Sequence, residues 1–435
     1  MSRKINLDKD LEYKGYWYLP SLPDKKIAGV LTYYPNEKIV LELIGSFEDS
    51  IPNLIDNFGK KELIIYGDTS SAKDITLIQC FKSASINFAA DFPLVTYTCR
   101  FMIIGKHINA WEEKCKYSVC VRIPELTYWC LPDALSTNTD SKQLSISFST
   151  QFQNGRNIIN EVQVNECTTI QIKKGVDYSS SDYLLKPILE QCTYVEIKKN
   201  KDVSIPELLN EIHLFEQFLS LATLGPIESN DITFYDEDIY QQIDERKYKK
   251  ELQLIYPSTE RKNITTNINR HQYLFLYSSI KDAFQTILEQ WYNAPADLYP
   301  IRNHLIDSIK KPIRNSVDFL IIMQAVEGFW WRFRDDEYHK ANSIPKKETT
   351  SLRTLLKELN AEFKEVDVID KSEIDYNAII DSRHYYSHFM PKEKRPKALD
   401  GWKLIEQAKI LRNLLICCVL SFVGMDKPLI NDILK

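Results

Sequence analysis

Glycine is scarce in this sequence, at 12 of 435 residues, and the glycines are not clustered. Dinucleotide-binding folds and phosphate-binding loops need several glycines close together, so neither is expected. A transmembrane span of about 20 apolar residues is also missing, because the best apolar run, 414–425, has only the length of a buried helix. The N-terminal residues lack the apolar stretch of a signal peptide, so we expect neither secretion nor membrane insertion.

A strong net charge is absent as well. The chain has 55 basic and 60 acidic residues, for a net charge of −5. Such a chain is not drawn as a whole to nucleic acid or to anionic membranes, although one local basic site remains compatible with it. The apolar fraction of 44% and the charged fraction of 26% are typical of globular proteins, and the length predicts two or three domains.

The cysteines do not follow a zinc-binding pattern. There are nine, and Cys115, Cys120 and Cys130 come closest to a cluster, but their spacing matches no standard zinc motif. Cys120 and Cys130 lie within apolar runs. We therefore interpret the cysteines as buried thiols of a reduced, cytoplasmic protein.

The first 200 residues have the pattern of short strands separated by turns. Their apolar segments are rich in β-branched and aromatic residues, and turn sequences such as Gly67-Asp68 and Asn154-Gly155 lie between them. These segments are 27–34, 39–44, 63–66, 95–99 and the alternating stretch 144–152. The pattern predicts a sandwich or barrel-like sheet, with the aromatic residues at 16–18 in its core rather than in a ligand cage.

Helical periodicity begins near Ser204, which we expect to cap a helix that has Pro206 in its first turn. The charged segment 235–250 is expected to be a connector. Further helices are predicted at 268–293, 315–340, 349–365, 373–390 and 400–424. The fold class is therefore multidomain α+β: a β-rich domain over 1–250 with a helical appendage from about 204, a helical connector over 251–310, and an all-α bundle over 311–435.

The densest group of chemically versatile residues lies between 381 and 397. Arg383, His384 and His388 fall within six residues, and the basic residues Lys392, Lys394, Arg395 and Lys397 follow. Pro391 disfavours helix at the residue before it, so the group is expected at an exposed helix end. An arginine binds phosphate and a histidine transfers protons near neutral pH, which together suffice for RNA cleavage by the 2′-hydroxyl without a metal.

Spacing alone leaves other interpretations open. Residues five apart on a helix are rotated by about 140°, so Arg383 and His388 are not expected to face one phosphate from one chain, and a second copy across a two-fold axis would complete the site. His384 and His388 have the i, i+4 spacing of metal-binding helices, but no acidic ligand follows at a recognised spacing. A solvated helix end without function is the third interpretation.

Three segments resemble a known family. Arg383-His-Tyr-Tyr-Ser-His388 is similar to the Arg-x4-6-His motif of HEPN ribonucleases, with a polar residue directly after the arginine. Residues 319–330 resemble the first HEPN helix of ApeA-type proteins, in which an acidic residue, here Glu327, follows a Gln-Ala-hydrophobic run. Residues 13–20, 27–33 and 39–47 are similar to the opening of the ApeA N-terminal domain.

The resemblance implies an anti-phage abortive-infection protein whose HEPN domain cleaves RNA, tRNA being one candidate substrate. Arg383 would bind the scissile phosphate, His388 would be the acid/base, and His384 would orient the motif or touch RNA. Glu327 would support the site or hold Arg383 in an ion pair. Lys392, Lys394, Arg395 and Lys397 would bind RNA.

The same resemblance implies a homodimer, or a higher homo-oligomer, that needs no metal and no cofactor. Its N-terminal domain would sense a phage-derived trigger. The alternative is an inactive HEPN module for dimerisation or nucleotide binding, joined to a β domain that binds a ligand or peptide.

Overall fold

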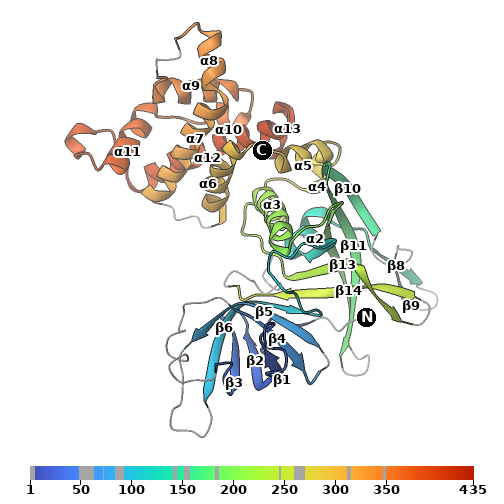
Figure 1. Ribbon diagram of the computed structural model, residues 1–435. Helices are drawn as coiled ribbons and strands as arrows, with labels where there is room; N and C mark the ends of the chain where they lie inside the picture. Colours follow the sequence, from blue (N-terminus) through green and yellow to red (C-terminus); the bar gives the residue numbers. More distant parts are fainter. Residues whose placement is uncertain are drawn as a thin grey trace.

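The computed structural model describes residues 5–48, 63–71, 73–83, 93–140, 145–150, 157–181, 186–243, 246–258, 270–310, 315–345 and 349–435. Strands fill most of the N-terminal part and helices fill 316–434 (Figure 1). The predicted α+β fold class is confirmed. None of the described helices is long and apolar enough to cross a membrane.

The first six strands close into an antiparallel barrel. They are β1 (Leu11–Tyr18), β2 (Ile27–Tyr34), β3 (Lys38–Ile44), β4 (Leu63–Thr69), β5 (Asp74–Ser83) and β6 (Leu94–Ile104). Their order is β6-β3-β2-β1-β4-β5, and pairing of β5 with β6 completes the circle. Alternate residues such as Leu31, Tyr33 and Tyr97 fill the interior, as period-2 patterning requires.

The aromatic opening divides between the two faces of the barrel wall. Trp17 is fully buried and Tyr18 is nearly so, whereas Tyr16 is 58% exposed. The interpretation of this segment as barrel core is thus right for Trp17, whereas Tyr18 is buried against Tyr66 and His107 outside that core. Gly67 lies opposite Trp17 on β4, and its missing side chain leaves room for the indole ring.

The barrel continues into a second sheet through β6. The strands that follow are β14 (Arg246–Ile255), β13 (Asp231–Ile243), β7 (Tyr117–Arg122), β12 (Lys186–Lys199), β11 (Thr168–Ser181) and β10 (Asn157–Asn165), while β8 (Leu135–Asp140) and β9 (Ser145–Thr150) form a separate hairpin. The expected turn at Asn154-Gly155 lies outside the described residues.

The prediction of a connector over 235–250 is wrong, because most of this segment belongs to β13 and β14 in the middle of the sheet. Two of its described charged side chains have partners of opposite charge. Asp236 is buried and accepts a 2.8 Å hydrogen bond from Lys106, and Glu237 pairs with Lys249 across the two strands. Cross-strand pairs of opposite charge stabilise a strand that the apolar pattern does not reveal.

Helix α3 (Ile205–Thr223) packs on this sheet and begins as predicted. The side chain of Ser204 accepts a hydrogen bond from the backbone of Glu207, and the Glu207 carboxylate accepts one from the backbone of Ser204. Such a capping box satisfies backbone donors that a helix start leaves free. The short α2 (Pro124–Cys130) lies beside α3.

The predicted single helix over 268–293 is instead broken. Its described part contains a 3-10 turn (Arg270–Gln272), α4 (Tyr277–Ile280) and α5 (Phe284–Tyr292), and α6 (Tyr299–Lys310) follows. The break lets Phe275, Tyr277 and Phe284 all contact the ring of Trp129. Tertiary packing here overrides the helical period.

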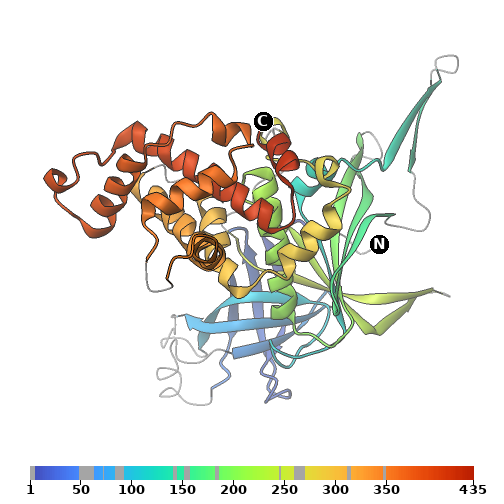
Figure 2. The same cartoon turned by 90° about the horizontal axis from the view of Figure 1, so that it is seen from above.

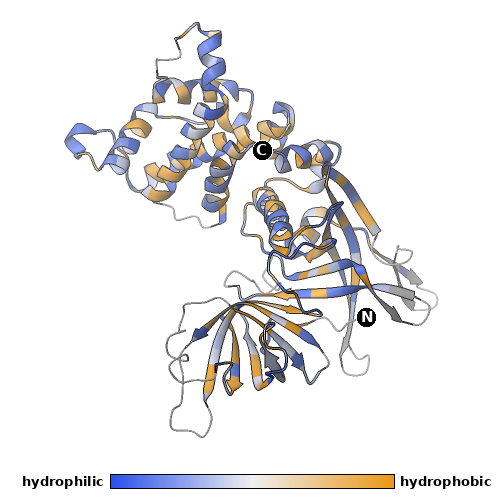
Figure 3. Ribbon diagram, viewed as in Figure 1, coloured by the Kyte–Doolittle hydropathy of each residue, from blue (hydrophilic) through white to orange (hydrophobic). Residues whose placement is uncertain are grey.

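The C-terminal bundle consists of α7 (Ser316–Phe333), α8 (Asp335–Ala341), α9 (Leu352–Glu362), α10 (Asp367–Asp370), α11 (Tyr376–His388), α12 (Gly401–Phe422) and α13 (Lys427–Leu434). The helix predicted over 315–340 is divided near Arg334, and the other three are shorter than expected. The buried residues of these helices are mostly apolar, whereas α8 and the outer part of α11 are largely hydrophilic (Figure 3). Seen from above, the bundle lies beside the sheet, with the barrel below (Figure 2).

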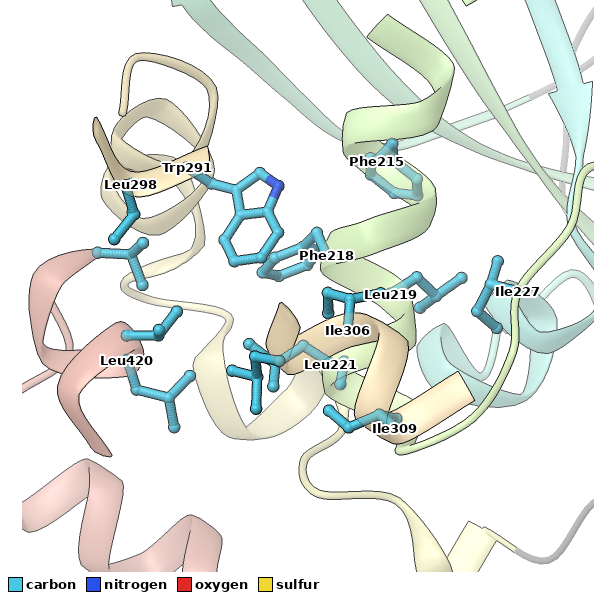
Figure 4. Packing of buried hydrophobic residues seen from close by; sticks show 14 of the residues in the cluster. Phe215, Phe218, Leu219, Leu221, Ile227, Trp291, Leu298, Ile306, Ile309 and Leu420 are labelled. Atoms are coloured by element: carbon cyan, nitrogen blue, oxygen red, sulfur yellow. The ribbon is translucent and has the colours of Figure 1, made fainter. Parts of the chain in front are cut away.

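One apolar core joins the second sheet to the bundle. Phe218 and Leu221 of α3, Trp291 of α5, Ile306 of α6 and Leu420 of α12 belong to the same cluster (Figure 4). Helix α6 also packs on α7. The domain boundary predicted at residue 311 stays a prediction. Helix α6, which precedes it, packs against the bundle through α7.

Candidate functional site

The candidate site lies on α11, at the outer end of the bundle and away from the barrel (Figure 1). The Asp375 side chain caps the start of this helix through the backbone of Ala378, and Ala378, Ile379 and Ser382 are its buried residues. The helix ends at His388, three residues before Pro391, as the proline predicted. This leaves Arg383 and His388 at an accessible end of the bundle.

Glu327 of α7 holds Arg383 from the bundle side. Nε and Nη2 of Arg383 donate to the two carboxylate oxygens of Glu327 at 3.1 and 3.2 Å. The Arg383 side chain is 24% exposed and the Glu327 side chain 14%. A two-point contact of this kind fixes the plane of the guanidinium as well as its position.

Arg383 also contacts His388 within the same chain. The Nη1 atom of Arg383 lies 2.8 Å from Nε2 of His388. The expectation that the two residues cannot face one phosphate from one straight helix therefore loses its angular support, because the side chains meet within one chain. The 140° angle applies to the directions in which side chains leave the backbone, and the long arginine side chain spans the difference. Since arginine only donates, Nε2 of His388 is the acceptor and carries no proton in this arrangement.

His384 stacks on His388, with ring centroids 5.7 Å apart and ring planes at 24°. Partial burial lowers the pKa of His384, and the positive charges of Arg395 and Arg383 lower it further. Its Nδ1 is buried without a hydrogen-bond partner. Stacked rings do not converge on one point, and Nε2 of His388 already faces Arg383, so this geometry does not suit a shared metal ion.

The basic segment 392–397 folds back against α11. Arg395 donates to Asp381 at 3.4 Å, and the backbone N–H of Lys397 donates to the same carboxylate at 3.2 Å. Lys392 bonds to the carbonyl of Ala398. Lys392, Lys394 and Lys397 remain exposed, so the segment presents positive charge from a fixed backbone.

Sequence reasoning gave no role to Asp381 or Ser382, which anchor this segment. Besides the Asp381 contacts, the Ser382 hydroxyl accepts a 2.8 Å hydrogen bond from the backbone of Leu399. Tyr386 donates to the carbonyl of Leu399 at 2.9 Å. Polar residues directly before Arg383 could have suggested an anchoring role. Their partners lie 14 to 17 residues later along the chain, so the sequence pattern does not identify them.

Two other features of the described residues lie away from α11. Among the described residues, Asp68, Asp74 and His107 have ligand-type atoms within 4.8 Å of one another, but Lys26 already lies 2.6 Å from Asp68. A hollow of about 420 Å³ lies between α5 and the end of α12. It shares no residue with α11.

Comparison with protein families gives two matches. The family model described as ApeA N-terminal domain 1 matches residues 12–291, which is more than half of the chain. The model described as Apea-like HEPN matches residues 320–429, which include Glu327, Arg383 and His388. No curated protein and no solved structure matches the chain.

Proposed function

Because the chain belongs to the ApeA family and carries an ApeA-like HEPN domain, we propose that it is a metal-independent endoribonuclease of bacterial anti-phage defence. HEPN domains are generally ribonucleases, which supports a nuclease role. The observation that carries the proposal is the contact chain from Glu327 through Arg383 to His388. It joins a fixed cation to an unprotonated imidazole nitrogen.

In the proposed step, a phosphate oxygen of the RNA takes the place of His388 beside Nη1 of Arg383. Nε2 of His388 then accepts the proton of the 2′-hydroxyl. The 2′-oxygen bonds to phosphorus, the bond from phosphorus to the 5′-oxygen breaks, and that oxygen takes a proton from water. His388 then gives the proton it accepted to the hydroxide that remains. The products are a 2′,3′-cyclic phosphate and a 5′-hydroxyl, and no metal is required.

The surrounding residues have supporting roles in this proposal. Glu327 positions Arg383. His384, whose pKa is lowered by burial and by neighbouring arginines, stays neutral near pH 7 and orients His388 or touches RNA. Lys392, Lys394, Arg395 and Lys397 attract the RNA backbone, an interaction that salt weakens.

The N-terminal domain is proposed to control cleavage in response to a phage-derived trigger. A route for this control runs through α6, which packs on α7. A side chain at Gly328 would lie 3.5 Å from Ile301 of α6, and Gly328 directly follows Glu327. A displacement of α6 would therefore reach the helix that positions Arg383. The proposal includes a homodimer, because HEPN domains often dimerise.

The test is cleavage of total cellular RNA by purified protein, with sequencing of the RNA ends. His388→Ala should lower the rate by about 10²–10⁴-fold, the usual effect of removing a positioned acid/base. Arg383→Ala should lower it by about 10²–10³-fold, the usual effect of removing one group that stabilises charge in the transition state. Cleavage by the parent should survive EDTA and leave 2′,3′-cyclic ends. His213→Ala, an exposed histidine of α3, is the matched control.

The second candidate function, an inactive HEPN module, is favoured if the parent binds RNA or nucleotide without cutting it. Dependence on a divalent ion, or 5′-phosphate products, would instead contradict the metal-free mechanism.

A further inference from the structure

Phe389, the residue after His388, has a side chain that is 90% exposed. It is the most exposed large apolar side chain among the described residues. Single exposed apolar residues are common on protein surfaces. This one adjoins the imidazole that faces Arg383, and the basic segment follows three residues later.

The backbone of Phe389 is left-handed, with φ 50° and ψ 38°. Glycine is the usual residue at this position after a helix, and a bulky side chain is disfavoured there. Leu131 and Leu224 end α2 and α3 in the same region, with exposures of 53% and 41%. The conformation therefore does not single out Phe389, but its exposure does. Neither packing nor backbone preference explains a phenylalanine here.

The chain around Phe389 is anchored. Arg395 lies 3.4 Å from the Met390 sulfur and also contacts Asp381, and Leu399 is tied to Ser382. The ring thus projects from a fixed backbone between His388 and the lysines. Within 389–397 there are four basic residues and one acidic residue, Glu393.

We propose that Phe389 stacks on the base of an unpaired nucleotide beside the scissile phosphate and so positions the RNA at Arg383 and His388. This inference rests on the proposed function. An exposed aromatic ring next to positive charge is the combination that binds single-stranded nucleic acid, because every base has a face to stack on. In a duplex those faces are covered by neighbouring base pairs.

The experiment measures binding of a fluorescein-labelled single-stranded RNA of mixed sequence to protein that carries His388→Ala, so that the RNA stays intact. Adding Phe389→Ala should weaken binding by about 5–150-fold, the fold-change that corresponds to loss of one stacked base. Phe389→Trp should retain binding. Phe389→Gly, which relieves the left-handed backbone, should behave like Phe389→Ala. Tyr16→Ala, an exposed aromatic of the barrel, is the control.

The same RNA carrying one abasic site at successive positions identifies the stacked base. At one position the abasic site should weaken RNA binding to the His388→Ala protein as much as adding Phe389→Ala does. In the protein that carries both substitutions, the same abasic site should weaken binding no further. A duplex of the same sequence should bind equally to both proteins.

The outcomes separate the two proposals. If the parent with His388 intact does not cut RNA, the proposed function is overturned. If it does cut RNA while Phe389→Ala and Phe389→Gly bind and cut as the parent does, only the stacking inference is overturned. A loss of self-association in sedimentation with unchanged RNA binding would assign Phe389 to a contact between copies and would also overturn it.

Discussion

Glu327 neutralises the charge of Arg383 from the side of Nε and Nη2 only. Glu327 takes Nε and Nη2, and Nη1 faces an imidazole nitrogen that a phosphate oxygen can replace. The carboxylate therefore leaves part of the guanidinium for substrate while it restricts the movement of the whole group.

Glu327→Ala should slow RNA cleavage by about 10²-fold, because a displaced catalytic group costs roughly this much. Glu327→Gln keeps an acceptor for Arg383 and should lose less. The loss should appear in kcat rather than KM if the role is positioning. Glu358→Ala, an exposed glutamate of α9, is the control, and thermal unfolding checks the fold. An unchanged kcat in Glu327→Ala would remove Glu327 from the site.

His384 makes folding stability depend on pH. Burial, Arg395 and Arg383 lower its pKa in the folded state, so the unfolded chain binds the proton more readily. The stability contributed by neutral His384 is fully present above its unfolded pKa of about 6.5, and it is lost as pH falls through the lower folded value.

His384→Gln should therefore reduce the drop in Tm between about pH 7.5 and pH 5. The measurement is thermal unfolding at several pH values, with His213→Gln on α3 as the matched variant. Parallel curves for the parent and His384→Gln would show that His384 does not contribute.

At the scale of single elements, the barrel depends on one close contact. Gly67 of β4 pairs with Trp17 of β1, and a Cβ atom at Gly67 would overlap the indole ring. The ring itself is fully buried, so relieving the overlap would require neighbouring core residues to move.

Gly67→Ala should lower the free energy of unfolding by about 1–3 kcal/mol, as overpacking of a core does. Gly225→Ala is the control, because its nearest neighbour would be a backbone oxygen at 3.9 Å. Denaturant titration measures both. Equal stability of the two variants would mean that the barrel accommodates the extra methyl group.

On the scale of the whole molecule, each chain brings together its own Arg383 and His388. A dimer of such chains contains two complete pairs, and the angular argument for a site shared between copies no longer holds. Dimerisation remains part of the proposal through the family.

Mixing Arg383→Ala protein with His388→Ala protein should consequently restore no RNA cleavage, since no chain in the mixture has both residues. The measurement compares cleavage by the mixture, after subunit exchange, with that of each variant alone. Recovery of activity in the mixture would show that arginine and histidine come from different chains.

The sequence by itself determined the α+β class, the cap of α3 at Ser204 and the end of α11 before Pro391. These features depend on local chemistry: periodicity, a hydroxyl cap, and the steric effect of proline on the preceding residue. It also identified Arg383, His384 and His388 as candidates through their clustering, and Glu327 through the family resemblance.

Only the tertiary structure decided how distant residues meet. The sequence pattern did not reveal that charged β13 and β14 are central strands, because a partner such as Lys106 for Asp236 lies more than a hundred residues away along the chain. The helix over 268–293 broke because several aromatic rings pack around Trp129. Arg383 reaches His388 because side-chain length and the hold of Glu327, 56 residues earlier, outweigh the helical rotation. Such contacts join residues that are distant along the chain, so the periodicity of the sequence does not predict them.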